Sequence, residues 1–350
     1  MTMVESAGIT DVGRKRKANE DSIFIDDRMR LYIVADGMGG HKAGEVASRV
    51  VVETIRDSMH RFMNNVDAGK MAYARKDLSP AANQLLSSIH LANQTVFQLS
   101  QTQPSYDGMG STASVVFLSG KSLIAANVGD SPIYLIREGK IETISTPHTY
   151  VAELAALDPV AAEKLSEQYR HMITRGMGLK EEVKPDVREI KAKKGDRVVI
   201  CSDGLSDKAS PEDIRSAIDG KPTKASCKAL VNMANERGGD DNITVIVLQL
   251  PSGTAKTDDA PKAPRGPISV DIDTEEASHT GFIEIHDAQG GHIKTTDPYT
   301  VGEELTLTFA NPKKSGYFTV SAKIVLRDAD GIEISFEHMD GETEKKLMLL

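Results

Sequence analysis

Short apolar runs flanked by acidic residues recur in the first 250 residues of the chain. The run Leu31–Ala35 ends at Asp36, and a second apolar run is followed by Asp203. Asp241 stands just before a third such run, and Asp21 just before a fourth. Runs of this length and β-branched content predict buried strands. Because a buried carboxylate is unfavourable without a positive partner, the pattern predicts a divalent cation at one shared site.

The rest of this region predicts paired helices among many short strands. Apolar residues recur at helical spacing over 43–63 and 79–101, whereas 148–185 is less regular. The other predicted elements are strands 3–10, 112–118, 122–128, 133–137, 141–145, 186–190, 197–202 and 242–249, and helices 210–218 and 223–237. Antiparallel strands with grouped helices predict an α+β fold, an antiparallel β-sandwich flanked by helix pairs.

The composition changes after residue 250. Residues 251–267 are rich in Pro, Ala, Ser, Thr, Lys and Asp without an apolar period, which predicts a linker between domains 1–250 and 268–350. Six short, mostly alternating runs and a helical end at 342–350 follow. They predict a small C-terminal six-stranded β-barrel.

Charge separates the same two parts. The chain has 42 Lys and Arg residues against 51 Asp and Glu residues, a formal net charge of -9. Residues 268–350 hold 7 of the basic and 16 of the acidic residues, so the remainder is neutral overall. An acidic balance argues against nucleic acid or an anionic membrane as a partner. The two cysteines lack metal-ligand spacing and no apolar run reaches the ~20 residues of a membrane span, so we expect a cytoplasmic protein.

Six motifs connect the acidic residues at the strand ends to a known family. They are GRKRKANED at 13–21, VADGMGGH at 34–41, GSTA at 110–113, VGDS at 128–131, SDGL at 202–205 and GDDN at 239–242. With these motifs, in the family's order and at its usual separations, residues 1–250 resemble the bacterial PPM-type, metal-dependent protein serine/threonine phosphatases. The resemblance implies the family's fold, two packed β-sheets with helices on their outer faces.

The resemblance also implies a core site for two Mn²⁺ or Mg²⁺ ions. Asp36 would bridge both ions, and the Gly37 carbonyl would bind one of them. Asp203 and Asp241 would hold one metal. Carboxylate, carbonyl and water oxygens are the ligands that such hard cations prefer.

Further acidic residues complete the implied ligand set. Glu20 and Asp21 would approach the second metal, partly through water. Asp130 and Asp207 would, together with Asp203, form the family's weaker third metal site.

The implied reaction is direct attack on the phosphate monoester by a metal-bridging hydroxide, without a phosphoenzyme. Arg16, four residues before Glu20, would orient the phosphate, because a guanidinium can bind two phosphate oxygens at once. His41 is the nearest candidate for the general acid. Animal members of the family carry a histidine where this chain has Met38, and water on a metal is the alternative acid.

Several neighbouring residues are interpreted as structural or solvated. Asp240 is expected to be a solvated neighbour of Asp241, and His148 an ordinary polar residue. The GSTA motif at 110–113 is interpreted as a tight turn into a strand. The other cations of the basic run are interpreted as a solvated face, namely Arg14, Lys15 and Lys17.

Residues 268–350 resemble a PilZ domain through the stretches FIEIHDAQGGHI, VGEEL and GIEISF. PilZ domains that bind cyclic di-GMP carry two arginines in a leading arm and then an Asp/Asn-x-Ser-x-x-Gly motif. Here the arm offers only Arg265, and Gln289 replaces the serine after Asp287. We therefore expect a degenerate PilZ-like domain for regulation or protein contact, without cyclic di-GMP binding.

Two functions of different class follow. The first is a metal-dependent phosphatase that hydrolyses phosphoserine and phosphothreonine in proteins and opposes a cognate serine/threonine kinase in bacterial signalling. The second is a non-catalytic scaffold that binds phosphoproteins or responds to a second messenger. The first is favoured because every expected carboxylate position is filled.

Overall fold

A computed structural model describes the chain in two compact units, Met1–Pro261 and Lys262–Leu350. The described residues are 4–39, 43–63, 73–166, 169, 172–251, 268–273, 278–287, 290–293, 295, 299–310, 317–327, 331–337 and 339–347. The predicted linker at 251–267 lies outside them except for its first residue.

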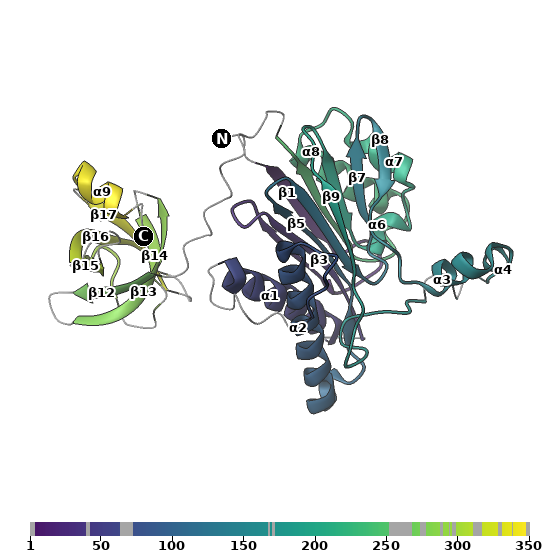
Figure 1. Cartoon of the computed structure of the whole chain (residues 1–350), viewed down its shortest axis with the longest axis horizontal. Coiled ribbons are helices and arrows are strands. Elements are labelled where there is room, and N and C mark those ends of the chain that lie inside the picture. Colours follow the sequence, from purple (N-terminus) through teal and green to yellow (C-terminus); the bar gives the residue numbers. More distant parts are fainter. Residues whose placement is uncertain are drawn as a thin grey trace. The chain divides into compact units, whose positions relative to one another are not determined.

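Two antiparallel sheets form the centre of the first unit (Figure 1). One has the order β1 (Glu5–Asp11), β11 (Ile243–Gln249), β10 (Arg197–Cys201), β7 (Ile133–Arg137) and β8 (Lys140–Thr143). The other has the order β2 (Asp21–Asp26), β3 (Leu31–Met38), β5 (Ala113–Ser119), β6 (Ser122–Val128) and β9 (Asp186–Lys191), with β4 (Gly110–Ser111) beside β3.

The two faces of β3 explain its uninterrupted apolar run. Leu31, Ile33 and Ala35 pack on one side with helix residues, whereas Tyr32 and Val34 join the core between the two sheets. A strand covered on both faces needs apolar residues at every position. The unit therefore has helices on the outer faces of two packed sheets, which is the predicted arrangement.

Helices cover each outer face. The side chains of α1 (Ala43–Met63) and α2 (Pro80–Thr102) pack in one core with those of β3, β5 and β6. On the other sheet lie α6 (Asp203–Ser206), α7 (Pro211–Ile218) and α8 (Thr223–Glu236), whose core includes residues of β10 and β11. A capping box at Ser210 and Asp213 fixes the start of α7.

The less regular region contains two short helices, α3 (Tyr150–Leu157) and α4 (Pro159–Glu163). They extend away from the sheets (Figure 1), and α3 buries none of its side chains. Thr149 and Asp158 cap their N-termini with side-chain oxygens. Local capping thus defines helices that the apolar pattern did not predict. A 3-10 turn, Pro104–Tyr106, follows α2 in the same unit.

The second unit is a closed barrel of six strands. Their order is β12 (Ile268–Asp273), β13 (Ser278–Asp287), β14 (Gly290–Ile293), β17 (Ile332–Glu337), β16 (Tyr317–Arg327) and β15 (Glu304–Ala310), and β15 pairs with β12. Leu347 of α9 (Gly341–Leu347) joins the barrel core. No helix among the described residues is long and apolar enough to cross a bilayer.

Candidate metal centre

Aspartates from both sheets meet at one end of the sandwich. Asp21 and Asp36 are direct partners in the register of β2 and β3. From the other sheet, Asp203 follows β10 and Asp241 precedes β11. The Ser202 hydroxyl donates to Asp21 Oδ2 at 2.8 Å, which joins the two sheets at this point.

Asp21 is buried, Asp36 and Asp203 are half-buried, and the pKa values of all three are raised. Burial, followed by the charges of Asp21 and Asp203, raises the pKa of Asp36 far above its usual value. Burial also raises the pKa of Asp203 to about 8, with the charges of Asp130 and Asp207 adding to the effect. The pKa of Asp21 is raised to about 6, again chiefly by burial. Several like charges share a desolvated site, which favours a bound cation.

Two carboxylate oxygens lack a protein partner. Asp21 Oδ1 and Asp203 Oδ1 are buried and accept no hydrogen bond from the described residues. Such orphaned oxygens fit hard divalent cations. Among the described residues, no three acidic, histidine or cysteine side chains converge on one ion position. Because Mg²⁺ usually keeps several waters and takes few carboxylates, the donor set still fits Mn²⁺ or Mg²⁺ with backbone and water ligands.

Glycines bring the backbone close to this centre. A Cβ at Gly37 would lie 2.1 Å from the Gly44 carbonyl oxygen and 2.6 Å from that of Glu20. Gly37 N donates to Glu20 O at 3.1 Å, and Glu20 N to Asn242 Oδ1 at 2.9 Å. The Glu20 carboxylate lies against Gly44 at the start of α1. Only a residue without a side chain fits at position 37.

Asp130 and Asp207 also belong to this cluster. Asp130 lies in the turn after β6, and Asp207 caps the C-terminus of α6, where its backbone N–H donates to Asp203 O at 2.8 Å. The charges of both residues raise the pKa of Asp203. The structure thus places Asp130 and Asp207 near Asp203, while the roles of these acidic residues as metal ligands stay predictions. His41 lies outside the described residues, so its assignment stays a prediction.

Arg16 lies at this centre, paired with a proposed metal ligand. Arg16 Nη2 is 2.7 Å from Asp241 Oδ2, and both side chains are partly exposed. Hydrogen bonding to Asp241 is the main reason that the pKa of Arg16 is raised. The segment between β1 and β2 carries both Arg14 and Arg16. It is held in place by a hydrogen bond in which Arg14 N donates to Gly239 O at 2.7 Å.

Asp240 has ion-pair partners that the sequence did not indicate. It is ion-paired with Lys15 at 2.5 Å and with Lys208, which lower its pKa to about 2. The Lys15 side chain is 67% exposed and that of Asp240 is 41% exposed, so the expectation that both are solvated is confirmed, and the ion pairs add to it. The partner Lys208 comes from 32 residues away, so proximity along the chain did not indicate it.

Thr112 of the GSTA motif orients Asp36. Its hydroxyl accepts from Asp36 N at 2.9 Å, and its own N–H donates to Asp36 O at 2.8 Å. The same hydroxyl lies 2.9 Å from Ser131 Oγ, in the turn that carries Asp130. The motif is more than a turn, because it connects two acidic segments of the centre.

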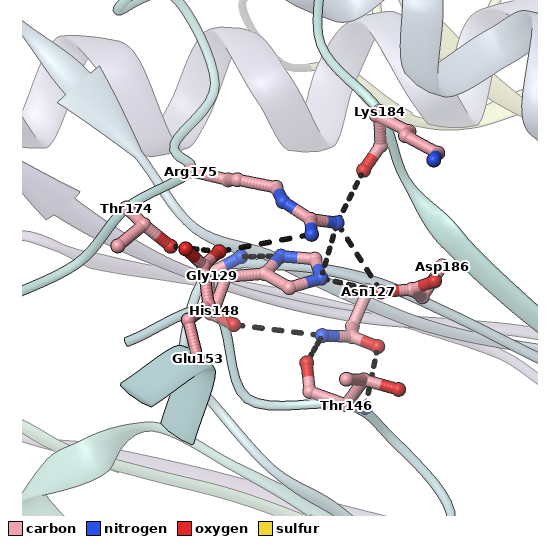
Figure 2. A network of polar contacts seen from close by, with 9 residues as sticks. All are labelled: Asn127, Gly129, Thr146, His148, Glu153, Thr174, Arg175, Lys184 and Asp186. Carbon is pink, nitrogen blue, oxygen red and sulfur yellow. Dashed lines mark hydrogen bonds and ion pairs between the residues drawn. The ribbon is translucent and has the colours of Figure 1, made fainter. Parts of the chain in front are cut away.

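His148 is a second residue whose role sequence reasoning missed. It is 1% exposed, and both ring nitrogens have hydrogen-bond partners, in a network with Asp186, Arg175 and the Gly129 backbone (Figure 2). No local pattern marks it, since the partners of its ring lie 19 to 38 residues away in the sequence.

Comparison with known proteins gives a consistent result. Residues 13–246 match the family model described as Protein phosphatase 2C. The serine/threonine protein phosphatase PstP of Mycobacterium tuberculosis is 33% identical over 245 residues, which are 70% of this chain and 44% of PstP. This chain thus spans less than half of the length of that relative. Protein phosphatase PhpP of Streptococcus pneumoniae is 32% identical over 258 residues, 71% of this chain and 98% of PhpP.

A solved structure agrees with the fold of the first unit. The catalytic domain of PstP in complex with two manganese ions superposes with a TM-score of 0.60 at 31% sequence identity. The match covers 71% of this chain and 99% of that domain.

Proposed function

Because this chain belongs to the protein phosphatase 2C family, we propose that it hydrolyses phosphoserine and phosphothreonine in proteins with the help of divalent cations. The observation that carries the proposal is the cluster of buried aspartates with two orphaned carboxylate oxygens. The family match, which ends at residue 246, supports a catalytic role for the first unit.

The residues present fit two Mn²⁺ or Mg²⁺ ions. Asp36, Asp203 and Asp241 would hold them, with Glu20, Asp21 and the Gly37 carbonyl nearby. A third ion would be held by Asp130 and Asp207 together with Asp203. The manganese complex of PstP supports a two-metal centre, and the choice between manganese and magnesium stays a prediction. When bound, such ions neutralise phosphate oxygens and activate water.

The chain's own side chains then bind and orient the phosphate monoester. Arg16 lies beside Asp241 and carries the guanidinium that would bind two phosphate oxygens. Thr112 holds the Asp36 backbone through two hydrogen bonds. The Asp36 carboxylate would therefore keep its position while the substrate is hydrolysed. Asp21 is buried, so little water reaches its side of the centre.

We also propose that the barrel of the second unit is a degenerate PilZ-like domain that regulates the phosphatase or contacts a protein. Its six antiparallel strands and its helix support the resemblance to a PilZ domain. Its acidic composition and single arm arginine argue against cyclic di-GMP as a ligand. A phosphoprotein substrate and a cognate kinase are the partners that follow from a signalling phosphatase.

The test is hydrolysis of p-nitrophenyl phosphate and of a phosphothreonine peptide by the full chain. We expect turnover with Mn²⁺ that EDTA abolishes and that Asp36→Asn lowers by orders of magnitude. Asp107→Asn is the matched control, because Asp107 is an exposed aspartate in the turn after the Pro104–Tyr106 segment. If the metal-loaded wild type turns over neither substrate, the non-catalytic binding function replaces this one.

A further inference from the structure

The segment that carries α3 and α4 is anchored at both ends to the candidate metal centre. We define the described residues of this segment, 149–166, 169 and 172–174, as the flap. At its start, His148 N donates to Gly129 O at 2.9 Å, next to Asp130. Thr174 N donates to His148 O at 2.8 Å, so the end of the flap returns to the same residue.

The ring of His148 adds two further contacts. Nδ1 accepts from Gly129 N at 3.1 Å, and Nε2 lies 2.6 Å from Asp186 Oδ2 (Figure 2). A backbone N–H can only donate, so Nδ1 carries no proton and the neutral ring has its proton on Nε2, facing Asp186. This tautomer follows from the hydrogen bonds. His148 therefore uses its N–H, its carbonyl and both ring nitrogens.

Arg175 closes the network from the far side. Its Nη1 lies 3.2 Å from His148 Nε2, 3.3 Å from Lys184 O and 3.4 Å from Asp186 Oδ2, and its Nη2 lies 3.7 Å from Glu153 of α3 (Figure 2). Burial, which Asp186 partly opposes and Arg175 reinforces, lowers the pKa of His148. The ring thus contacts Asp186 of β9 and Arg175 on one side, with Arg175 reaching Glu153 of α3, and Gly129 on the other.

Gly129 packs against Thr112, which is hydrogen-bonded to Asp36. Its φ is +102°, and a Cβ there would lie 2.6 Å from Thr112 Cγ2, so the turn is packed directly on Thr112. Thr112 makes the two hydrogen bonds that hold the Asp36 backbone. Displacement of Gly129 would therefore disturb the turn of Asp130 and the support of Asp36.

We propose that His148 is a positioning residue that, through Nδ1, joins the base of the flap to the Gly129–Asp130 turn. This inference rests on the proposed phosphatase function. A phosphoprotein is large enough to contact the flap, whose Leu157 and Val160 are exposed. Substrate contact with the flap would then be coupled to the position of Asp130, whereas a small phosphate ester would not use this route.

Two substitutions separate the roles of the two ring nitrogens. In His148→Asn the side-chain oxygen takes the place of Nδ1 and can still accept from Gly129 N. In His148→Gln the amide reaches toward Asp186 but leaves the Gly129 N–H without its acceptor. We expect amide exchange at Gly129, measured by NMR, to stay near wild type in the first variant. In the second it should be about two- to tenfold faster, the effect of one lost hydrogen bond.

Packing alone predicts the opposite order. If His148 only fills space, the smaller asparagine leaves the larger cavity and does more damage than glutamine. His148→Asn with faster exchange at Gly129 than His148→Gln would therefore overturn the proposal. His90→Asn serves as the control, because His90 is a partly buried histidine of α2 whose ring stacks on Tyr73.

A second variant avoids any change in the core. Asp186 is 40% exposed, and Asp186→Ala removes the carboxylate that accepts from Nε2, one of the two contacts that set the ring tautomer. We expect the ¹⁵N shifts of His148 to show a mixture of tautomers and Gly129 exchange to rise. Unchanged shifts and exchange in this variant would contradict the proposal.

Kinetics provides the functional readout. In His148→Gln and Asp186→Ala, kcat/KM for a phosphothreonine peptide that extends beyond the phosphorylated residue should fall more than kcat/KM for p-nitrophenyl phosphate. His148→Asn should restore the wild-type ratio. Equal losses for both substrates would reject the coupling. If the wild type hydrolyses neither substrate, the phosphatase proposal fails, while the order of amide exchange still decides the role of His148.

Discussion

Arg16 Nη2 lies 2.7 Å from Asp241 Oδ2, which pairs the expected phosphate-binding cation with an expected metal ligand. A guanidinium and a divalent cation compete for the same carboxylate. Metal binding would therefore free Arg16 at the place where a phosphate has to be bound. The pair keeps Arg16 beside the centre before the substrate arrives.

The first prediction concerns this competition. We expect Arg16→Ala to tighten Mn²⁺ binding about 1.5- to 5-fold, because an exposed ion pair contributes ~0.2–1 kcal/mol. The same change should raise KM for p-nitrophenyl phosphate, since the phosphate loses its guanidinium. Isothermal titration calorimetry measures the first effect. Arg14→Ala, a neighbouring exposed arginine, is the control, and weaker Mn²⁺ binding by Arg16→Ala would contradict the competition.

The second prediction is a pH dependence of stability without metal. The folded pKa of Asp203 is about 8 and that of Asp21 about 6, both above the usual value of 3.8. Between these folded values and 3.8 the folded state binds more protons than the unfolded state, so stability falls as pH rises. In EDTA, we expect a higher Tm at about pH 6.5 than at about pH 8.5. Saturating Mn²⁺ should remove this trend, and a metal-free Tm that rises with pH would refute the assignment.

Much of this centre could be predicted because its aspartates lie at strand ends. An apolar run that stops at an aspartate shows both the strand and the carboxylate in one short segment, as at Asp36 and Asp203. The paired sheets then bring these ends together. The glycine directly after Asp36 was a further local signal, because it indicated a close approach of the backbone. The structure has no space for a side chain at Gly37.

The supporting residues could not be predicted because their partners are distant in sequence. Asp186 lies 38 residues from His148, and Ser131 lies 19 residues from Thr112. Neither histidine nor threonine shows from its neighbours whether it is solvated or buried. The short helices of the flap were missed for a related reason: α3 buries no side chain, so no apolar stripe was needed.

The third prediction tests the support of Asp36. Thr112→Val keeps the shape of the side chain and removes the hydroxyl that accepts from Asp36 N. A buried N–H left without its acceptor costs about 1–3 kcal/mol, so we expect the free energy of unfolding to fall by that amount. kcat should also fall as Asp36 loses its alignment. Thr112→Ser keeps the hydroxyl and should retain most of the activity, and equal kcat values for the two variants would show that the hydroxyl does not matter.

The fourth prediction separates stability from function at Asp203. Its pKa is raised because burial and neighbouring carboxylates oppose its charge, so a neutral side chain of the same shape relieves that cost. Asp203→Asn should therefore raise the Tm of the metal-free protein at pH 8, while it weakens Mn²⁺ binding and abolishes turnover. Differential scanning calorimetry without and with Mn²⁺ measures the first two effects, and hydrolysis of p-nitrophenyl phosphate measures the third. Asp213→Asn should act in the opposite direction on stability, because Arg237 and Ser210 bind that carboxylate and hold its pKa below the usual range.

A less stable Asp203→Asn protein in EDTA would contradict this prediction. It would mean that the Asp203 carboxylate stabilises the fold, and that its charge is not opposed by the neighbouring carboxylates.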